Sequence, residues 1–471
     1  MSPAELFALL PVLILALGSA ALLLLGAWQA PPRLLLFSGV ALALAAAAAA
    51  IFLPAAVAEV SRLYGAGAYA RFFTVLWSGV AALTLLLSVR YAEERRFAVG
   101  EYTALVLFAA AGMALLSAAT SLVGFFLGLE AYTLVLYILI AFHKKDALGA
   151  EAGLKYLILG AVGTAFLAFG IALIYTASGT FHLPEAMAGI AAGTQMRPIG
   201  LLGWGMLLVV IGFKVSLVPF HLWTPDVYQG APAPVAGLLS TGSKGAVFAA
   251  LVTLLAGLSA GRAELEPFLW LLSVLSMLVG TLCALRQENL KRMLAYSSVV
   301  HMGYVLIALL AGGGAGRAAV VFYLVVYAVV NLGAFGVIAS LADAKEEPQS
   351  NSDFHGIGWR YPLRCAVLAI FLLSLAGIPP TAGFMGKFAI FHAAIAADLP
   401  LLAALGILAS LVSVYYYLRV IMLMFMTYEC PVRHPRGGAA EHTALAFCLA
   451  ATLILGIYPG PLFDLIVVIL P

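Results

Sequence analysis

Three lysines and one glutamate stand inside long apolar runs of this sequence, where a charge is costly. They are Glu130, Lys214, Lys244 and Lys387. A charge at the centre of a bilayer costs about 2.5–3.5 kcal/mol on insertion scales, so a residue of this kind is functional by default. Apolar surroundings favour a neutral amine and a nearby carboxylate favours a charged one, so such a lysine can switch its protonation. We interpret all four as candidates for binding and passing on protons.

Each of these interpretations has a structural alternative. Glu130 and Lys214 could form a static ion pair that holds helices together. Lys244 lies among small and hydroxyl-bearing residues, which leave room for water, but it could also merely cap a polar pocket. Lys387 follows a proline-containing stretch and is predicted to be a proton-binding site or an exit gate.

Four further ionisable residues could form a secondary path: His221, Asp226, His301 and His392. Imidazole titrates near neutral pH and can relay a proton, although a lone histidine is more often structural. His301 lies in a hydroxyl-rich stretch and is the strongest candidate of the three. Asp226 could instead cap the half-helix that follows it, or line a cytoplasmic entrance. Arg419 is predicted to extend its guanidinium to the membrane interface.

The composition requires an integral membrane protein. Of 471 residues, 64% are hydrophobic and only 10% are charged, and the mean hydropathy is +1.09. Soluble domains are nearer half apolar and a quarter charged, so a soluble enzyme, a disordered chain and a nucleic-acid-binding protein are excluded. The cysteines lack CxxC spacing, and no nucleotide-binding glycine motif occurs, so we expect no metal site and no cofactor on this chain. The cysteines are Cys283, Cys365, Cys430 and Cys448.

Fourteen apolar runs are long enough to cross a bilayer as helices. They lie near 4–26, 33–57, 72–89, 101–119, 121–141, 154–177, 198–218, 233–258, 267–285, 294–311, 317–342, 362–397, 401–427 and 443–469. The runs are apolar all round rather than alternating, which excludes a membrane β-barrel. The sequence therefore predicts an all-α polytopic membrane protein with about fourteen spans.

The basic residues are distributed unevenly between the two sides that this count defines. The loops of one side hold Arg33, Arg90, Arg95, Arg96, Lys144, Lys145, Lys155, Arg286, Lys291, Arg292, Lys345, Arg360, Arg364, Arg433 and Arg436. The loops of the other side hold Arg62, Arg71, Arg197, Arg262 and Arg317. The positive-inside rule then predicts that both termini lie on the outer, periplasmic side of the cell inner membrane.

Proline interrupts two of the runs, around Gly212 to Pro234 and around Leu375 to Phe388. Proline removes a backbone donor, so both helices should break, and broken backbone at membrane depth must be satisfied by protein or a water-filled cavity. The breaks fall five spans apart, which predicts two inverted five-helix repeats, spans 4–8 and spans 9–13. The expected domains are residues 1–100, three N-terminal spans; 101–258, the first repeat; 259–427, the second repeat; and 428–471, a C-terminal span.

Three stretches of this sequence resemble the signatures of a known family. They are Lys214 to Pro234, Leu290 to Tyr304 and Ser374 to Phe388. In this order they are similar to the antiporter-like membrane subunits of respiratory complex I, the proton-translocating NADH–quinone oxidoreductase, and of multi-subunit cation/proton antiporters. The resemblance implies that Glu130 and Lys214 form a coupling ion pair.

The resemblance further implies that Lys244 is a central relay and Lys387 a terminal site. Residues 224–232 and the lysine at 387 are similar to one complex I subunit type. A second type carries glutamate at that position, and a third is longer, with a lateral C-terminal helix. We therefore expect a proton-translocating subunit of the complex I type, with a subunit of a multi-subunit cation/proton antiporter as the alternative.

This hypothesis also predicts cofactors and partners. FMN, iron–sulfur clusters and quinone would act in other subunits, with none on this chain. The partners would be other membrane-arm subunits, including antiporter-like ones, and the lipid bilayer, with no nucleic acid. The electron donor, the quinone and the proton stoichiometry stay open at this point.

Overall fold

Thirteen helices of the computed structural model are long and apolar enough to cross a membrane, counted over the described residues. The structure describes residues 2–53, 57–191, 196–256, 262–343, 347–426, 435 and 437–470. Cys430, Lys345, Arg433, Arg436 and the two predicted domain boundaries at 258/259 and 427/428 lie outside these ranges.

Twelve of the spans are single helices. They are α2 (Leu10–Ala27), α3 (Pro32–Phe52), α4 (Ala68–Glu94), α5 (Val99–Ser117), α6 (Leu122–Ile140), α7 (Ala147–Ser178), α9 (Arg197–Lys214), α13 (Arg262–Leu285), α14 (Leu290–Ala311), α15 (Gly313–Leu341), α20 (Pro400–Met426) and α21 (Ala439–Ile457). The remaining span, Ala233–Leu255, joins α11 (Ala233–Leu238), the π-helix η1 (Leu239–Ser243) and α12 (Lys244–Ala256).

Short elements complete the chain. They are α1 (Pro3–Ala8), α8 (Leu183–Ala191), α10 (Thr224–Gly230), α16 (Asn351–Phe354), α17 (Ile357–Arg360), α18 (Pro362–Ala376), α19 (Ala382–Ala396) and α22 (Gly460–Ile469). A small hairpin pairs β1 (Glu59–Val60) with β2 (Tyr64–Gly65), with Glu59 opposite Gly65. The helix pair α18 and α19 forms the broken span predicted at 362–397, the twelfth in chain order. The predicted all-α membrane fold is confirmed.

The last predicted run is wrong in one respect. Residues 443–469 form two helices, because α21 ends at Ile457 and α22 begins at Gly460. Pro459 lies in this junction and Pro461 is the second residue of α22. A residue that precedes proline is disfavoured in the helical region. The chain therefore turns after the last long span instead of continuing straight.

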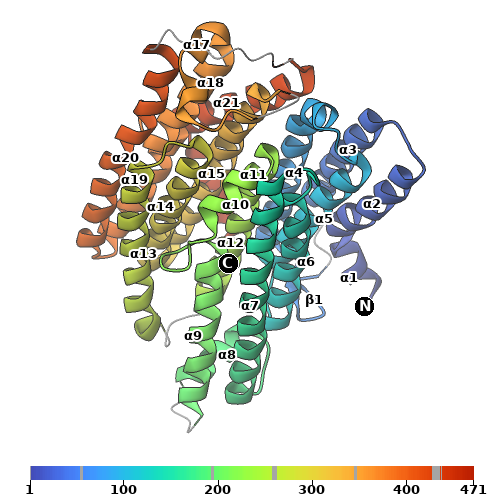
Figure 1. Ribbon diagram of the computed structural model, residues 1–471. Helices are drawn as coiled ribbons and strands as arrows, with labels where there is room; N and C mark the ends of the chain where they lie inside the picture. The colour runs from blue at the N-terminus through green and yellow to red at the C-terminus, as the bar shows by residue number, and fades with distance from the viewer. Residues whose placement is uncertain are drawn as a thin grey trace.

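The two predicted repeats pack in the same way. In the first, α5 contacts α6 and α12; in the second, α13 contacts α14 and α20. The broken helix of each repeat packs beside a long helix, α9 and α10 beside α7, and α18 and α19 beside α15. Figure 1 shows α2 to α5 on one side of the molecule, α13, α19 and α20 on the other, and α10 to α12 and α15 between them.

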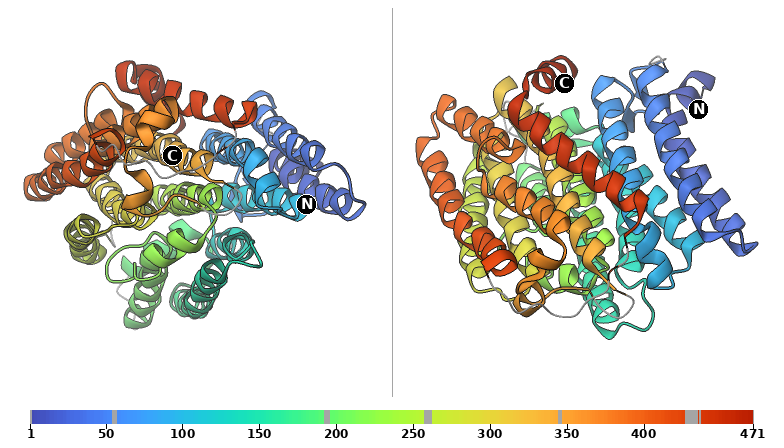
Figure 2. Two further views of the ribbon diagram at one scale, coloured as in Figure 1. Left: turned by 45° about the horizontal axis from the view of Figure 1, so that its top comes forward. Right: turned by 90° about the horizontal axis from the view of Figure 1, so that it is seen from above.

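Two helices at the centre of the bundle are almost completely buried. In the membrane-spanning stretches of α14 and α15, 94% of the residues are buried. Helix α21 contacts α4, α15 and α19, and so joins the N-terminal spans to the second repeat. Figure 2 shows α21, in red, extending from the C-terminal helices to the blue N-terminal ones. Most side chains of α14 and α15 are therefore held away from lipid.

Side-chain caps set where several spans begin. Ser121 accepts a hydrogen bond from the backbone N–H of Gly124 at the start of α6. Asp146 caps α7 and Asn289 caps α14 in the same way. A helix leaves its first N–H groups without partners, so these polar residues stabilise the ends at which the apolar runs meet the loops.

Candidate functional site: a row of buried lysines

The first broken helix is stabilised by protein contacts, as broken backbone at membrane depth requires. Helix α9 ends at Lys214, and α10 begins only at Thr224. The backbone N–H of Val218 donates to Ser276 Oγ at 3.0 Å, and the Trp223 indole donates to the carbonyl oxygen of Phe213 at 3.0 Å. The predicted break is confirmed, and it places Lys214 on the last turn of a half-helix.

Lys214 is fully buried, and its ammonium contacts no carboxylate among the described residues. Its Nζ donates to Thr133 Oγ1 at 3.2 Å and lies 6.0 Å from the centre of the Tyr137 ring. Glu130 accepts a hydrogen bond of 2.9 Å from Thr164 Oγ1. Thr133 lies three residues after Glu130 and so on the same face of α6. The implied ion pair is therefore open here, with Thr133 beside the carboxylate.

Lys244 is the first residue of α12, directly after the π-helix η1, and its side chain is 0% exposed. Its Nζ donates to Ser298 Oγ at 2.7 Å and lies 5.2 Å from the centre of the Tyr228 ring. The hydroxyl of Thr241 donates to the carbonyl oxygen of Gly237 at 2.8 Å. Such a bond competes with the helix ladder, and π-turns of this kind often accompany functional sites.

Lys387 lies in the second turn of α19, after the second break. Its Nζ donates to the carbonyl oxygen of Ala376 at 3.0 Å and to Ser410 Oγ at 2.8 Å. Ala376 is the last residue of α18, where unpaired carbonyls leave partial negative charge. The half-helix therefore stabilises the charged amine without a carboxylate. In chain order Lys387 follows its break, whereas Lys214 precedes its own.

One side of α14 connects Lys244 with Lys387. Ser298 hydrogen-bonds Lys244, and the Tyr304 ring lies 5.3 Å from the Lys387 Nζ. Between them, His301 contacts the hydroxyl of Tyr323 through Nδ1 and that of Tyr417 through Nε2, the latter at 3.1 Å. Positions three apart on a helix lie on one face. Ser298, His301 and Tyr304 therefore form a polar row between the two lysines.

Buried hydroxyls without a hydrogen-bond partner lie between Lys214 and Lys244 in the described part of the chain. They are those of Tyr137, Tyr156 and Ser243. The Tyr137 and Tyr156 ring centres are 5.0 Å apart, and Tyr156 lies 4.5 Å from Trp223. Buried polar groups nearly always have a partner, so this region is suited to ordered water.

Asp226 does not have the first of its two predicted roles, the helix cap, and its role at a cytoplasmic entrance stays a prediction. It is the third residue of α10, whose N-cap is Trp223, so it is not the cap. Its two carboxylate oxygens accept from Lys155 at 2.8 Å and from Arg292 at 2.7 Å. Burial raises the pKa of Asp226, but these hydrogen bonds outweigh it and hold the pKa below its usual value. Asp226 thus joins α7, α10 and α14 on the side that the basic loops define.

Two of the predicted secondary residues lie apart from the buried lysines and from the polar row on α14. His392 is exposed on α19 and stacks on Phe388, with ring centres 6.0 Å apart. His221 is buried at the first break and packs near Tyr296, with ring centres 6.2 Å apart. Of the three candidate histidines, only His301 lies between two of the buried lysines.

Arg419 extends to the loop between α13 and α14 and caps the end of α13. Its guanidinium donates to the carbonyl oxygen of Leu285 at 3.1 Å and to that of Gln287. Leu285 is the last residue of α13, so Arg419 supplies the donors that the helix end lacks. Sequence reasoning could not find this cap, because it depends on α20 lying beside α13.

Several contributing residues were not singled out from the sequence. Thr133, Ser298 and Ser410 are the hydroxyl partners of Lys214, Lys244 and Lys387. Hydroxyl residues are common in apolar helices, where they often bond their own backbone, so no local signal marks these three. Among the described residues, no group of three His, Cys, Asp or Glu side chains could hold a metal ion.

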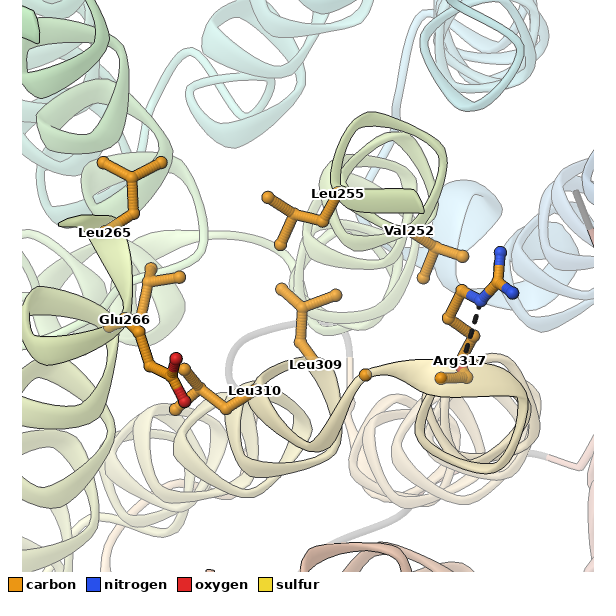
Figure 3. A pocket seen from close by; sticks show the side chains of 10 residues that line it. Val252, Leu255, Leu265, Glu266, Leu309, Leu310 and Arg317 are labelled. Atoms are coloured by element: carbon orange, nitrogen blue, oxygen red, sulfur yellow. Dashed lines mark hydrogen bonds between the residues drawn. The ribbon is translucent and has the colours of Figure 1, made fainter. Parts of the chain in front are cut away.

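A separate cavity of about 170 Å³ lies at the opposite end of α12 and α14 from Asp226, and Figure 3 shows it. Glu266 of α13 and Arg317 of α15 are its charged lining residues, and Arg317 Nε donates to the carbonyl oxygen of Gly313 at 3.0 Å. None of the four predicted charges lines this cavity, so it is distinct from the lysine row.

Close packing at the second break gives a testable prediction. A Cβ atom at Gly383 would lie 1.8 Å from the carbonyl oxygen of Ser374. Gly383→Ala is therefore expected to push α18 and α19 apart, to cost about 1–3 kcal/mol of stability, and to displace Lys387. Thermal unfolding of the purified protein checks this. Gly79→Ala is the matched control, because no atom lies within 4 Å of its added Cβ. Equal stability of the two variants would contradict the tight crossing.

The fold and the buried lysines are typical of one class of membrane protein, and similarity to known proteins indicates the same class. The family described as "NADH:quinone oxidoreductase/Mrp antiporter, TM" matches residues 119–413. The NADH-quinone oxidoreductase subunit N of Syntrophotalea carbinolica is 48% identical over 461 residues, covering 97% of each chain. The chain therefore belongs to the NADH:quinone oxidoreductase/Mrp antiporter family and, within it, to the subunit N group.

Two solved structures have the same fold. A chain of respiratory complex I from Thermus thermophilus with bound Aureothin has a TM-score of 0.82 and 35% identity, covering 96% of this chain and 98% of that one. A chain of the Mrp complex from Dietzia sp. DQ12-45-1b has a TM-score of 0.80 and 20% identity, covering 99% and 97%. The second likeness shows the fold alone.

Proposed function

We propose that this chain is a proton-translocating membrane-arm subunit of an NADH–quinone oxidoreductase. One observation carries the proposal: three buried lysines lie in one bundle together with a polar row on α14. Each is hydrogen-bonded to a neutral oxygen, and none forms an ion pair with another described residue. Such lysines cost stability in a static scaffold, because each needs a charge desolvated without a counter-charge. They suit groups that gain and lose a proton.

The open arrangement at Glu130 and Lys214 supports a switching role. The Lys214 ammonium and the Glu130 carboxylate are held by two different threonines, Thr133 and Thr164. If the carboxylate and ammonium closed into a pair, the lysine would be stabilised in its charged form; opening the pair favours loss of its proton. In this mechanism, a charge change at Glu130 alters the proton affinity of Lys214 and then of Lys244.

Protons would then move from Lys244 toward Lys387 along α14. Ser298, His301 and Tyr304 are the groups placed between the two lysines. A hydroxyl or imidazole can accept a proton on one side and donate on the other, which a chain of apolar side chains cannot do. Lys387, against the carbonyl end of α18, would be the terminal site.

The chain itself would carry out no redox chemistry. Under this proposal FMN, iron–sulfur clusters and quinone act in other subunits, and quinone reduction there drives the charge changes at Glu130. Other membrane-arm subunits, including antiporter-like ones, are its partners. The uneven distribution of Lys and Arg between the loops of the two sides supports a multi-pass protein of the cell inner membrane with both termini on the outer side.

The experiment that tests this function is Lys214→Met in the assembled complex. Membrane vesicles are assayed for NADH oxidation and for NADH-driven proton uptake with an acridine dye. Lys214 acts on Lys244 through electrostatics, and a coupling of about 1–3 kcal/mol predicts a fall in pumping of roughly tenfold. Arg286→Met, which removes an exposed charge on the basic side, is the control.

Two outcomes would contradict the proposal. If Lys214→Met abolished tolerance of external cations but left NADH-driven proton uptake intact, the antiporter alternative would be favoured. If neither property changed, Lys214 would not take part in transport at all. Purification of the tagged chain in mild detergent gives an independent check, because flavin and iron–sulfur subunits should accompany it.

A further inference from the structure

A basic pocket lies at the ends of α4, α5 and α6, away from the lysine row. Its volume is about 720 Å³. The basic lining residues are Arg95, Arg96, His143, Lys144 and Lys145. All of them belong to the α4–α5 and α6–α7 loops, which lie on the side with most basic residues. The pocket is therefore at the height where helices leave the hydrocarbon and meet water.

The same pocket has an apolar wall that continues along the helices. Leu23 of α2 and Ile138 of α6 line it and are 47% and 55% exposed. Leu105 of α5 lies between them, and Phe108, one turn further on α5, is 39% exposed. In the membrane-spanning stretch of α5, 78% of the residues are buried, compared with 28% in α2 and 61% in α6. Helix α5 is thus recessed, and the three helices form a groove that begins at the basic loops.

Three basic residues of the pocket have no ion-pair partner among the described residues. Arg96, Lys144 and Lys145 are exposed, and no ion pair holds any of them in the described part of the chain. Glu101 is the carboxylate that lines the pocket, and Asp146 beside it caps α7 through the N–H of Leu148. The site therefore has an excess of positive charge.

The turn that presents these residues is firmly built. Phe97 packs against Tyr102 and Phe142, with ring centres 5.3 Å and 5.2 Å away, and so ties the α4–α5 loop to α5 and to the end of α6. Arg96 has φ of 53°, and its backbone N–H donates to the carbonyl oxygen of Glu93. The basic loops thus form a fixed surface over the groove.

We propose that this pocket binds one anionic phospholipid of the inner leaflet. Its phosphate would lie against Arg96, Lys144 and Lys145, and an acyl chain would follow the groove past Leu105 and Phe108. Basic pockets between transmembrane helices on the cytoplasmic side are suited to anionic headgroups. A free phosphate ion would leave the apolar half of the site unused, so the lipid fits better.

The test uses the purified complex in lipid nanodiscs that contain a photoactivatable phosphatidylglycerol or, separately, the phosphatidylcholine with the same acyl chains. We expect the phosphatidylglycerol probe to label peptides of α5 and α6 and the phosphatidylcholine probe to label them weakly. Two lysine charges at about 1 kcal/mol each correspond to a roughly thirtyfold change in preference. Lys144→Gln with Lys145→Gln should reduce the labelling by this factor.

Arg286→Gln with Arg360→Gln is the matched control, because it removes two exposed basic residues from the same side. It should leave labelling unchanged, and both double variants should keep wild-type NADH oxidation, since neither touches the lysine row. Equal labelling by the two probes would overturn the proposal. So would displacement of the lipid probe by inorganic phosphate, or absence of label because a partner subunit covers the pocket.

Discussion

Lys244→Met is expected to lower NADH-driven proton translocation through this subunit by roughly a hundredfold or more. Lys244 is completely buried, and its polar contact among the described residues is the hydroxyl of Ser298. Without the amine, a proton must enter the middle of the bundle with no base to hold it. A cost of about 2.5–3.5 kcal/mol for a charge at membrane depth corresponds to a factor of about 10² in rate.

The measurement is proton uptake per NADH oxidised in membrane vesicles. Lys244→Arg is the informative companion, because guanidinium keeps the charge but cannot release its proton. It should assemble normally and still fail to pump. Ser298→Ala removes a hydrogen bond and should lower pumping only modestly. Wild-type pumping in Lys244→Arg would show that a fixed positive charge is sufficient, and would exclude a proton-binding role for this lysine.

Glu347→Gln is expected to destabilise the subunit by about 3–5 kcal/mol, because it leaves a buried ammonium without its counter-charge. Lys291 and Glu347 form an ion pair of 2.7 Å, and both side chains are buried. Lys291 Nζ also donates to the carbonyl oxygen of Ala231 at 2.6 Å, while Glu347 accepts from the backbone N–H of Ala233 at 2.9 Å and from the Tyr91 hydroxyl. The pair therefore anchors the start of α11, the helix that leads to Lys244.

Thermal unfolding of the purified complex and the amount of assembled subunit in membranes measure this effect. Lys291→Met combined with Glu347→Gln should recover part of the loss, because no unpaired charge is then buried. A single variant as stable as the wild type would show that the pair contributes nothing. Glu441→Gln is not a suitable control, since Glu441 is itself buried against Arg90.

The same ion pair predicts how stability depends on pH. Burial raises the pKa of Glu347, but the charge and hydrogen bond of Lys291 outweigh it and hold the pKa below its usual value. The stabilisation is therefore complete above the ordinary glutamate pKa of about 4.3 and is lost as the pH falls through the lower, folded-state pKa. The wild type should lose stability in that acid range more steeply than Glu347→Gln does.

The sequence by itself determined the class of fold and the candidate functional residues. Apolar runs of about twenty residues can satisfy their backbone in a membrane only as helices, so the number of spans follows from length and hydropathy. The prolines near Lys214 and Lys387 marked both breaks for the same backbone reason. Lys214, Lys244 and Lys387 stood out because a charge in such a run is expensive, whatever its neighbours are.

Only the tertiary structure decided which groups these charges meet. Thr133, Ser298 and Ser410 belong to other helices than their lysines. The position of His301 between Lys244 and Lys387 depends on how α14, α15 and α20 pack. His392 carries the same chemistry as His301, yet it faces outward. Apolar runs that are hydrophobic all round carry no signal for which face is buried, so the rotation and partners of each helix are set by packing alone.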